Sequence, residues 1–579
     1  MVLPFYMASL ISKRKKNKLY YYVVESARVN GQPRIIHQTY LGSAEKVAAL
    51  VKDRTAPLPV SASFRELGLP GALWLAAQDT GVFQVLHSLW PSPRSGPSPA
   101  HYLLLAAIHR ICRPGPKTEV ADWYQKTVLF PTWGFPPERF TSQAFWDGFE
   151  QILPEPQGRF LNGDQDPLEE AQQRLLALWK DRPLVSRRVL AYDTTNFYTF
   201  IASTNQRNTL AQRGHQKQGR HDLRQVGLSY ALDGDCGMAL CHHVYPGQVA
   251  DAEEFPVALD RMLRMLDRNA IARESVTLVL DKGTAALANT VLLREARLGW
   301  ISALPWNQAP AEFRARDVKH LPACGGDQPG VQAAAEKILV HGEEYLCVLK
   351  YSGCFAVEQL HSLATTLSKV TQQLRSLATE LSRPGCRLTE GSVRRKISRW
   401  LSGAFLSELV HYQLRAEGAG LRLQFQINHP ALETLYSQRL GRTLLITNRL
   451  DWSAEQVVAA YSGQQNIEQV FRGLKGGDWL HWGPMHHWTD SKIRIHAFYC
   501  LLGISLLNQV HRQAQQVWPQ LTTEKLKDEL EEICEAVLLY PPQAKGPCRT
   551  ATVLSCQSLI QKTLADALAL QRVCSTHRG

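Results

Sequence analysis

Five residues in the C-terminal third fall on one face of a predicted helix. They are Tyr461, Gln464, Glu468, Phe471 and Lys475. Their spacings of 3, 4, 3 and 4 place them together at about 100° per residue. A carboxylate on a face that also carries aromatic rings is unusual, because burying an unpaired charge is costly. Glu468 is therefore a candidate for chemistry. The alternative is an amphipathic helix with Glu468 at its rim, paired with Arg472.

The flanking residues predict the elements that position this face. Residues 444–447 form a short apolar and β-branched run, which is typical of a buried strand. Ser453 is placed to cap a helix that begins at Ala454 and continues through Lys475. The sequence thus predicts a strand, a short turn and a helix that carries Glu468.

The pattern Tyr461-x2-Gln464-x3-Glu468-x6-Lys475 resembles a known signature. It is similar to the Y-(2)-R-(3)-E-(6)-K motif of bacterial insertion-sequence DDE transposases. One position departs from the motif, since Gln464 stands where the family has arginine. The resemblance implies a multidomain α/β protein with an RNase-H-like catalytic core. A β-rich insertion is expected to interrupt that core.

Two aspartates lie in strand-like contexts earlier in the chain. Residues 189–195 predict a strand that ends in the acidic Asp193, and residues 275–280 predict a strand followed by Asp281. The wider pattern is three strands, a helix, a strand, a helix and a strand. That order is similar to the start of an RNase-H-like fold, in which family members carry one Asp on the first strand and one after the fourth.

The resemblance implies that Asp193, Asp281 and Glu468 bind the catalytic metal ions. Two Mg²⁺ ions are expected, with Mn²⁺ as a substitute, because hard oxygen ligands hold such ions about 3.5–4 Å apart during phosphodiester cleavage. An aspartate at a strand end also serves as a turn residue or a helix cap. Asp233, Asp235 and Asp251 are rivals, although the Asp-Gly-Asp sequence is typical of a hairpin turn.

The resemblance also implies DNA contacts near the cleavage site. Tyr461, Gln464 and Lys475 would contact phosphate, and Arg472 would supply the charge that Gln464 lacks if the DNA lies on that side. The implied partners are double-stranded DNA at terminal inverted repeats and target DNA, bound by a homodimer at the DNA ends.

Composition agrees with an anionic partner. The 579 residues carry a formal net charge of +13, which favours nucleic acid. Twelve cysteines without C-x-x-C pairs indicate neither a zinc finger nor a disulfide framework. The basic run at residues 13–16 follows an apolar start, which is the wrong order for a secretory signal, and the apolar run at 497–507 is too short to span a bilayer. We expect a cytoplasmic, nucleoid-associated bacterial protein without a membrane partner.

Six regions are predicted along the chain. Residues 1–95 are expected to hold a hairpin and helix and residues 96–185 a helical domain, both candidates for DNA binding. The core follows in residues 186–305, the insertion in 306–442, the second part of the core in 443–515 and a helical tail in 516–579. Within the insertion, apolar residues alternate every 3 and 4 positions from Leu360 to Leu381. They favour an intramolecular hairpin with residues 392–415 over a dimer interface.

The sequence therefore predicts a transposase. It would cut DNA at the ends of a mobile element and transfer the strands into target DNA. One alternative is an RNase-H-like nuclease without strand transfer. Another is a non-catalytic DNA-binding repressor derived from a transposase, which the retained acidic residues argue against.

Overall fold

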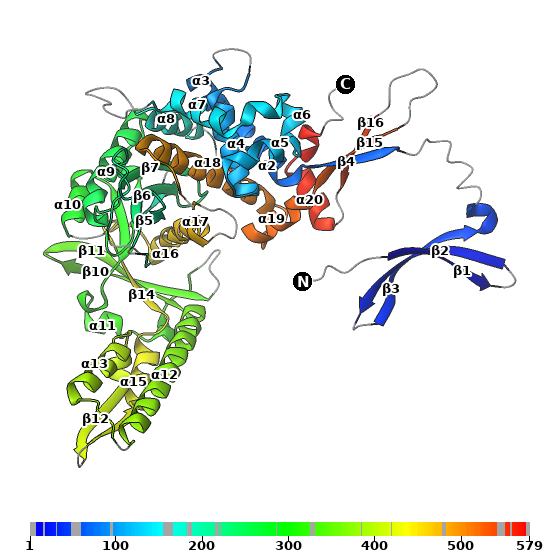
Figure 1. The fold of residues 1–579 in the computed structure, drawn as a ribbon. Coiled ribbons are helices and arrows are strands. Elements are labelled where there is room, and N and C mark those ends of the chain that lie inside the picture. The colour runs from blue at the N-terminus through cyan, green and yellow to red at the C-terminus, as the bar shows by residue number, and fades with distance from the viewer. Residues whose placement is uncertain are drawn as a thin grey trace.

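The protein is a mixed α/β structure built around one large sheet (Figure 1). The structure is a computed structural model of residues 1–579. It describes all residues except 1–6, 16–17, 30–31, 48–58, 93–95, 155–165, 181, 183, 185–187, 215–218, 221, 285–286, 325–329, 384, 418–419, 477–481, 484, 541–549, 556–557 and 575–579.

Within the described residues, the central sheet has eight strands in the order β10-β11-β14-β9-β8-β5-β6-β7. They are β5 (Val189–Thr199), β6 (Arg224–Asp233), β7 (Ala239–Pro246), β8 (Thr277–Leu280), β9 (Gly299–Ala303), β10 (Val331–Val340), β11 (Glu343–Ser352) and β14 (Arg442–Thr447). β8 runs parallel to both β5 and β9, and the other neighbours are antiparallel. The predicted order of three strands, helix, strand, helix and strand is confirmed, with α9 (Asp251–Arg268) and α10 (Leu287–Glu295) as its helices.

Helices from both ends of the chain pack beside this sheet. The N-terminal helices are α2 (Gly68–Asp79), α3 (Val82–Leu89), α4 (Pro99–Cys112), α5 (Val120–Gln125), α6 (Leu129–Trp133), α7 (Ser142–Ile152) and α8 (Pro167–Trp179). α11 (Ala311–Arg314) lies between β9 and β10, and the helices after the last sheet strand are α16 (Ala454–Ser462), α17 (Gln464–Gly476), α18 (Asp490–Gln515), α19 (Thr523–Glu531) and α20 (Leu559–Ala567). α18 is long and apolar enough to cross a membrane, but 83% of its apolar window is buried against α2, α4, β7 and their neighbours. Its composition is therefore that of a core helix.

A separate three-stranded antiparallel sheet precedes these helices. Its strands are β1 (Met7–Lys15), β2 (Lys18–Val29) and β3 (Gln32–Ser43). The predicted hairpin is confirmed as β2 and β3, and its turn lies outside the described residues. β1 adds a third strand, which contains three of the four residues of the basic run 13–16.

Segments from the N-terminal and C-terminal regions pair in a third sheet, which corrects the prediction of a helical tail. β4 (Ser61–Glu66) pairs with β15 (Cys534–Leu539), and β15 pairs with β16 (Thr550–Ser555). The C-terminal tail is therefore not wholly helical, and the segment before α2 is a strand. Local sequence patterns do not indicate this pairing, because the paired strands are about 470 positions apart in the chain. An ion pair of 3.1 Å between Arg65 and the buried Glu535 joins the same two strands.

An arm projects from the β10–β11 end of the central sheet (Figure 1). It consists of α12 (Gly353–Leu381), α13 (Glu390–Trp400), α14 (Leu406–Leu409), β12 (Val410–Glu417), β13 (Gly420–Ile427) and α15 (His429–Gln438). Leu374 and Leu377 of α12 pack with Val393 and Ile397 of α13 in one apolar core. The intramolecular interpretation of the leucine repeat is confirmed.

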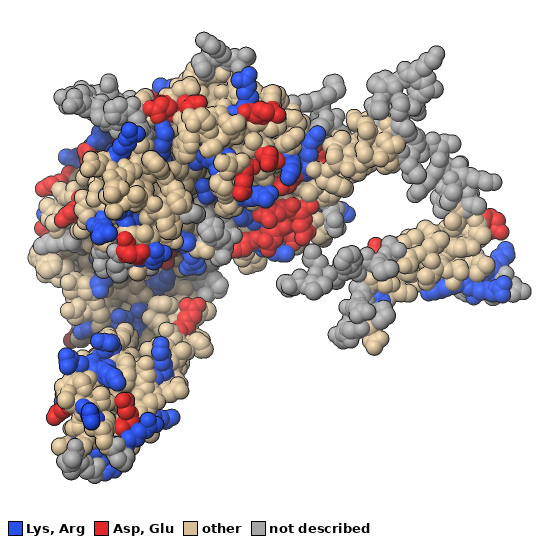
Figure 2. All heavy atoms as spheres, in the orientation of Figure 1, with Lys and Arg blue, Asp and Glu red and all other residues tan. Residues whose placement is uncertain are grey.

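Charge is unevenly distributed over these parts. Residues 369–422 of the arm contain 10 Lys and Arg against 4 Asp and Glu. Figure 2 shows basic side chains over the arm, whereas acidic side chains gather over α19. The arm is thus more basic than the chain as a whole.

Candidate active site

The two predicted aspartates come together at the centre of the sheet. Tyr192 of β5 pairs in parallel register with Leu280, the last residue of β8. The next residues along the chain are Asp193 and Asp281. Their side chains therefore project from adjacent positions on two neighbouring strands, whose backbones are about 4.8 Å apart. Asp193 does not end its strand as predicted, because pairing with β6 continues β5 to Thr199.

The face of β5 that carries Asp193 is the one covered by α17. Tyr192 packs edge-on against Phe255 of α9, with ring centroids 5.3 Å apart. Successive strand residues point to opposite faces, so Asp193 points away from α9. Phe197 shares the face of Asp193, and the Lys475 Nζ of α17 lies 6.0 Å from its ring centroid. The helix with the predicted glutamate therefore lies over the aspartates' side of the sheet.

Each aspartate carboxylate accepts a hydrogen bond from a backbone N–H one or two positions later in the chain. The Thr194 N–H donates to Asp193 Oδ1 at 2.7 Å, and the Gly283 N–H donates to Asp281 Oδ2 at 3.4 Å. Asp193 is half-buried and Asp281 is exposed. This pair offers fixed carboxylate oxygens, and the one on Asp281 is open to solvent.

The predicted single helix after β14 is two helices. The Ser453 cap is confirmed, because its hydroxyl accepts from the Gln456 N–H while the Gln456 side chain accepts from the Ser453 N–H. α16 stops at Ser462 and α17 begins at Gln464. At Gly463 the backbone changes to shorter turns, with hydrogen bonds three residues apart.

A close backbone contact explains the break. A Cβ at Gly463 would lie 3.1 Å from Gly234 Cα in the β6–β7 turn, and Asn466 Nδ2 donates to the Gly234 oxygen at 2.7 Å. The start of α17 is therefore fastened to the turn that follows β6.

Glu468 lies at the exposed rim of α17. Among the described residues no ion pair joins it to Arg472, so the simple paired-rim alternative is not observed. The pKa of Tyr461 is raised to about 12, first by burial and then by the charges of Asp281 and Glu468. Both carboxylates are thus close enough to act on one phenol.

Gln464 is inside the protein. Its side chain is 6% exposed, and Oε1 has no hydrogen-bond partner among the described residues. The predicted phosphate contact stays a prediction, since in this conformation the amide does not face solvent.

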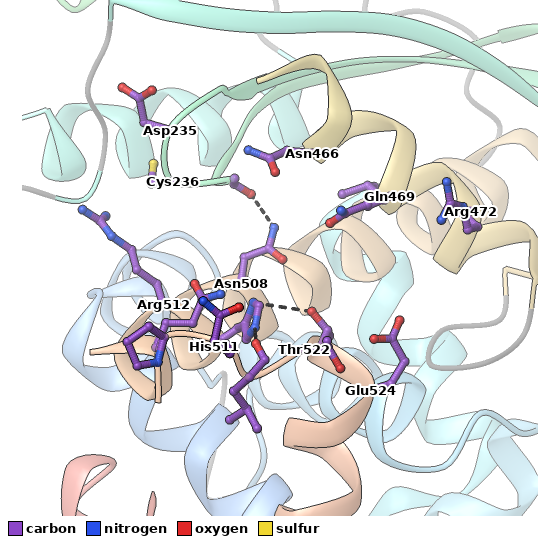
Figure 3. Close-up of a pocket in the computed structure, with 17 residues that line it drawn as sticks. Asp235, Cys236, Asn466, Gln469, Arg472, Asn508, His511, Arg512, Thr522 and Glu524 are labelled. Atoms are coloured by element: carbon purple, nitrogen blue, oxygen red, sulfur yellow. Dashed lines mark hydrogen bonds between the residues drawn. The ribbon is translucent and has the colours of Figure 1, made fainter. Parts of the chain in front are cut away.

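Arg472 points to a different surface, a groove of about 590 Å³ (Figure 3). α17 lines one side with Asn466, Gln469 and Arg472, and α18 with the residues after it lines the other, including Arg512. The groove carries both signs of charge, since Asp235 and Glu524 also line it. Arg472 therefore faces a groove of mixed charge.

Two aromatic residues missed in the sequence support the site. Trp482 stacks on Phe197 with ring centroids 4.2 Å apart and an angle of 11°. Both are buried, and Phe197 lies beneath Lys475. The available signal was that Phe197 is four residues after Asp193 on a strand and so shares its face.

Two of the three predicted metal ligands are placed together, and the third is not. Asp193 and Asp281 offer the carboxylate oxygens that Mg²⁺ and Mn²⁺ prefer. Across the described ranges, no three side chains of His, Cys, Asp or Glu converge closely enough to hold a metal. Glu468 must therefore approach the aspartates before all three can bind together.

The rival aspartates have structural roles. Asp233 is fully buried and its carboxylate accepts from the N–H groups of Asp235 and Cys236, which forms the predicted turn. Asp251 begins α9 and accepts from the Tyr245 hydroxyl at 3.1 Å. These contacts remove Asp233 and Asp251 from the face that carries Asp193.

Comparison with known proteins gives similar solved structures and one family match. Among solved structures, the chain is similar to the piggyBac transposase synaptic complex with hairpin DNA, with 8% identity, 82% of each chain covered and a TM-score of 0.33. It is also similar to the Mos1 transposase paired-end complex with left transposon end, with 14% identity, 36% of this chain and 60% of that chain covered and a TM-score of 0.14. Scores this low carry no argument, and the search of curated proteins gives no match. A family model described as a transposase DDE domain matches residues 186–506, more than half of the protein. The chain therefore belongs to the transposase DDE domain family.

Proposed function

We propose that this protein cleaves DNA at the ends of its own mobile element and joins those ends to target DNA. The observation that carries the proposal is the parallel register of β5 and β8, which puts Asp193 beside Asp281 under α17. A family member with two adjacent carboxylates on one sheet face is suited to phosphodiester chemistry. Its activity depends on a divalent ion, with Mg²⁺ or Mn²⁺ as the candidates.

The strands β7-β6-β5-β8-β9 are proposed as an RNase-H-like core. β5 is central, with the antiparallel β6 and β7 on one side and the parallel β8 and β9 on the other. Residues 306–442 are the insertion, which supplies β10, β11 and the arm. The order of strands and helices supports this assignment.

Asp193, Asp281 and Glu468 would hold the metal ions. When bound there, these ions activate a water or 3′-hydroxyl and stabilise the leaving oxygen. Asp193 and Asp281 would fix the position through β5 and β8, whereas Glu468 would have to approach them from α17. The carboxylates must stay ionised to do this.

Tyr461 and Lys475 would position the phosphate. Because the pKa of Tyr461 is about 12, its phenol stays protonated at neutral pH and its O–H donates to a phosphate oxygen. The Lys475 ammonium lies over the Phe197 ring on the same side of the sheet. The two groups supply one neutral and one charged donor. Gln464 and Arg472 remain weaker candidates, because one is buried and the other lines the groove.

DNA-end recognition is assigned to the N-terminal regions, residues 1–95 and 96–185. The basic residues of β1 and the net charge of +13 support this assignment. The DNA partners are the terminal inverted repeats and target DNA, engaged by a homodimer. The protein would act in the bacterial cytoplasm, at the nucleoid.

A cleavage assay tests the proposal against its alternatives. Full-length protein is mixed with DNA that carries the element's flanking inverted repeats and a target plasmid. We expect nicked and joined products with Mg²⁺ or Mn²⁺ and none with a chelator or with Asp281→Asn. Cleavage without joined products would instead identify a nuclease, and binding without cleavage a repressor. Full activity after exhaustive chelation would overturn the metal-dependent mechanism.

A further inference from the structure

An exposed aromatic surface lies beyond the candidate active site. Trp488 is 72% exposed, the most exposed aromatic side chain in the described part of the chain, and Phe200 is 42% exposed. Phe200 stacks on the exposed ring of His486, with centroids 5.3 Å apart and an angle of 22°. Two residues span at most about 7 Å of chain, so Trp488 lies near this stack. We call Phe200, His486 and Trp488 the aromatic ledge.

Hydrogen bonds fasten the ledge from two segments. The Phe200 N–H donates to the Met485 oxygen at 3.0 Å, and Asn205 Nδ2 donates to the Trp488 oxygen at 2.9 Å. Further on, the Thr209 N–H and hydroxyl donate to the Asp490 carboxylate at 2.9 and 2.5 Å. The ledge is thus a built surface, in which exposed rings are held by satisfied backbone groups.

The ledge residues lie after the two elements of the candidate active site along the chain. Phe200 comes after β5, which carries Asp193, and His486 and Trp488 come after α17, which carries Glu468. Seven strand residues from Asp193 to Phe200 span roughly 23 Å, the length of about seven base pairs. Phe200 packs on Tyr198, whose side chain points to the face opposite Asp193, so DNA bound at the aspartates would reach the ledge by passing the end of β5.

The surrounding charge suits a phosphate backbone. The described residues between 200 and 224 include four Arg and one Asp, and that Asp222 is paired with Arg220 at 3.0 Å. The Arg220 guanidinium lies 5.6 Å from the ring centroid of Tyr198, which itself packs edge-on against Phe200. Alternating cations and open rings are the composition of surfaces that bind single strands, where bases stack on aromatic faces.

We propose that the aromatic ledge binds unpaired bases of a DNA single strand, roughly 23 Å from the aspartates. Bases within a duplex are already stacked on each other, so only an unpaired base presents a free face to Trp488. This inference rests on the proposed function, because it requires the protein to act on DNA. It adds a strand-binding surface separate from the carboxylates.

Binding measurements on the full-length protein test the ledge. Two labelled DNAs share one duplex that contains the terminal repeat, and only one of them ends in a six-nucleotide single-stranded tail. At fixed salt, Trp488→Ala should weaken binding to the tailed DNA on the order of 5-fold to 150-fold and leave blunt DNA within about 2-fold. Trp488→Phe should retain most of the tail affinity, because it keeps a ring.

Matched variants guard against trivial effects. Tyr436→Ala removes an aromatic side chain of similar exposure, 60%, from α15 and should change neither affinity. Phe200→Leu removes a ledge ring but keeps an apolar side chain, and it should weaken only the tailed complex. These two variants keep the proposal testable even if Trp488→Ala folds poorly.

Three outcomes would overturn the ledge. Equal losses of affinity for tailed and blunt DNA would mean that the ledge contacts the duplex. No loss of affinity for either DNA would mean that the ledge does not bind DNA. A shift from dimer to monomer in sedimentation, with unchanged tail affinity, would make it a contact between two copies of the chain. If the unaltered protein binds neither DNA, the proposed function fails with it, whereas binding and cleavage with no tail effect removes the ledge alone.

Discussion

The strand-borne and helix-borne carboxylates differ in how firmly they are placed. Asp193 and Asp281 project from paired parallel strands whose neighbours are buried. Glu468 lies at the exposed rim of α17, beyond the break at Gly463, and does not complete a metal-binding group with them. Sheet pairing thus fixes the two carboxylates that are proposed as ligands, whereas the proposed third one depends on the position of the helix.

The difference indicates where the site has freedom to adjust. The backbone of a central strand cannot shift without breaking ladder hydrogen bonds, so the point from which its side chain projects is fixed. A rim side chain on a helix that follows a break can shift at lower cost. The variants below test this contrast, from the largest expected effect to the smallest.

Changing side-chain length should separate the two classes. Asp193→Glu extends a fixed carboxylate by one methylene, so we expect cleavage to fall on the order of 10²-fold, as misplacement by about 1 Å can do. Glu468→Asp shortens a carboxylate on an adjustable helix, so we expect a loss of less than about 10-fold. Single-turnover cleavage rates at saturating metal measure both.

The contrast fails if the order is reversed. A larger loss for Glu468→Asp than for Asp193→Glu would mean that α17 is the rigid part of the site. End binding by gel shift serves as the control, because neither change should alter it.

The sequence was most informative where chemistry is local. Asp193 and Asp281 were found because apolar strand residues precede each of them, and Ser453 because a cap has a clear residue preference. The meeting of β4 with β15 was missed, since no local pattern records a partner so far along the chain. Family membership, in turn, rests on residues 186–506 and leaves the individual site residues as predictions.

Replacing Gln464 with arginine should destabilise the folded protein. From the sequence alone, Gln464→Arg is predicted to increase cleavage or end-complex stability if Arg472 does not compensate, because arginine restores the charged donor of the family motif. Since the side chain is 6% exposed, we expect an unpaired buried charge and a free energy of unfolding lower by roughly 3–5 kcal/mol. Urea unfolding of Gln464→Arg measures it.

The next residue gives a matched control. Gln465 is exposed, so Gln465→Arg should leave the free energy of unfolding within about 0.5 kcal/mol. A stable Gln464→Arg variant that cleaves faster would show that arginine leaves this buried position and reaches phosphate, as the family motif implies.

The break at Gly463 depended on a contact that sequence patterns do not contain. Tyr461 and Gln464 were placed on one continuous helix because helical spacing continues across Gly463. The break arises from the approach of Gly234, more than 200 positions earlier. Periodicity therefore overestimated how regularly Tyr461 and Gln464 share a face with the rest of α17.

Adding a side chain at Gly463 should lower the free energy of unfolding less than Gln464→Arg does. In Gly463→Ala the new Cβ would lie 3.1 Å from Gly234 Cα, so α17 or the β6–β7 turn must shift by a few tenths of an ångström. We expect the free energy of unfolding to fall by about 1 kcal/mol relative to Gly476→Ala. Gly476 is the control, because nothing lies within 4 Å of its added Cβ. Equal stability of the two variants would mean that the contact does not constrain the helix.

Removing the Tyr461 hydroxyl should have the smallest effect. The phenol is a neutral donor, and a neutral hydrogen bond contributes about 1 kcal/mol, so Tyr461→Phe should slow cleavage by roughly 5-fold. Burial and the charges of Asp281 and Glu468 raise the pKa of Tyr461 to about 12, so the protonated form persists as pH rises and the loss should be constant from about pH 7 to about pH 9. Cleavage rates of both proteins across that range measure it, with Tyr436→Phe as a remote control. A loss that disappears toward the alkaline end would mean that the phenol ionises there, and that Asp281 and Glu468 are farther from it than the structure places them.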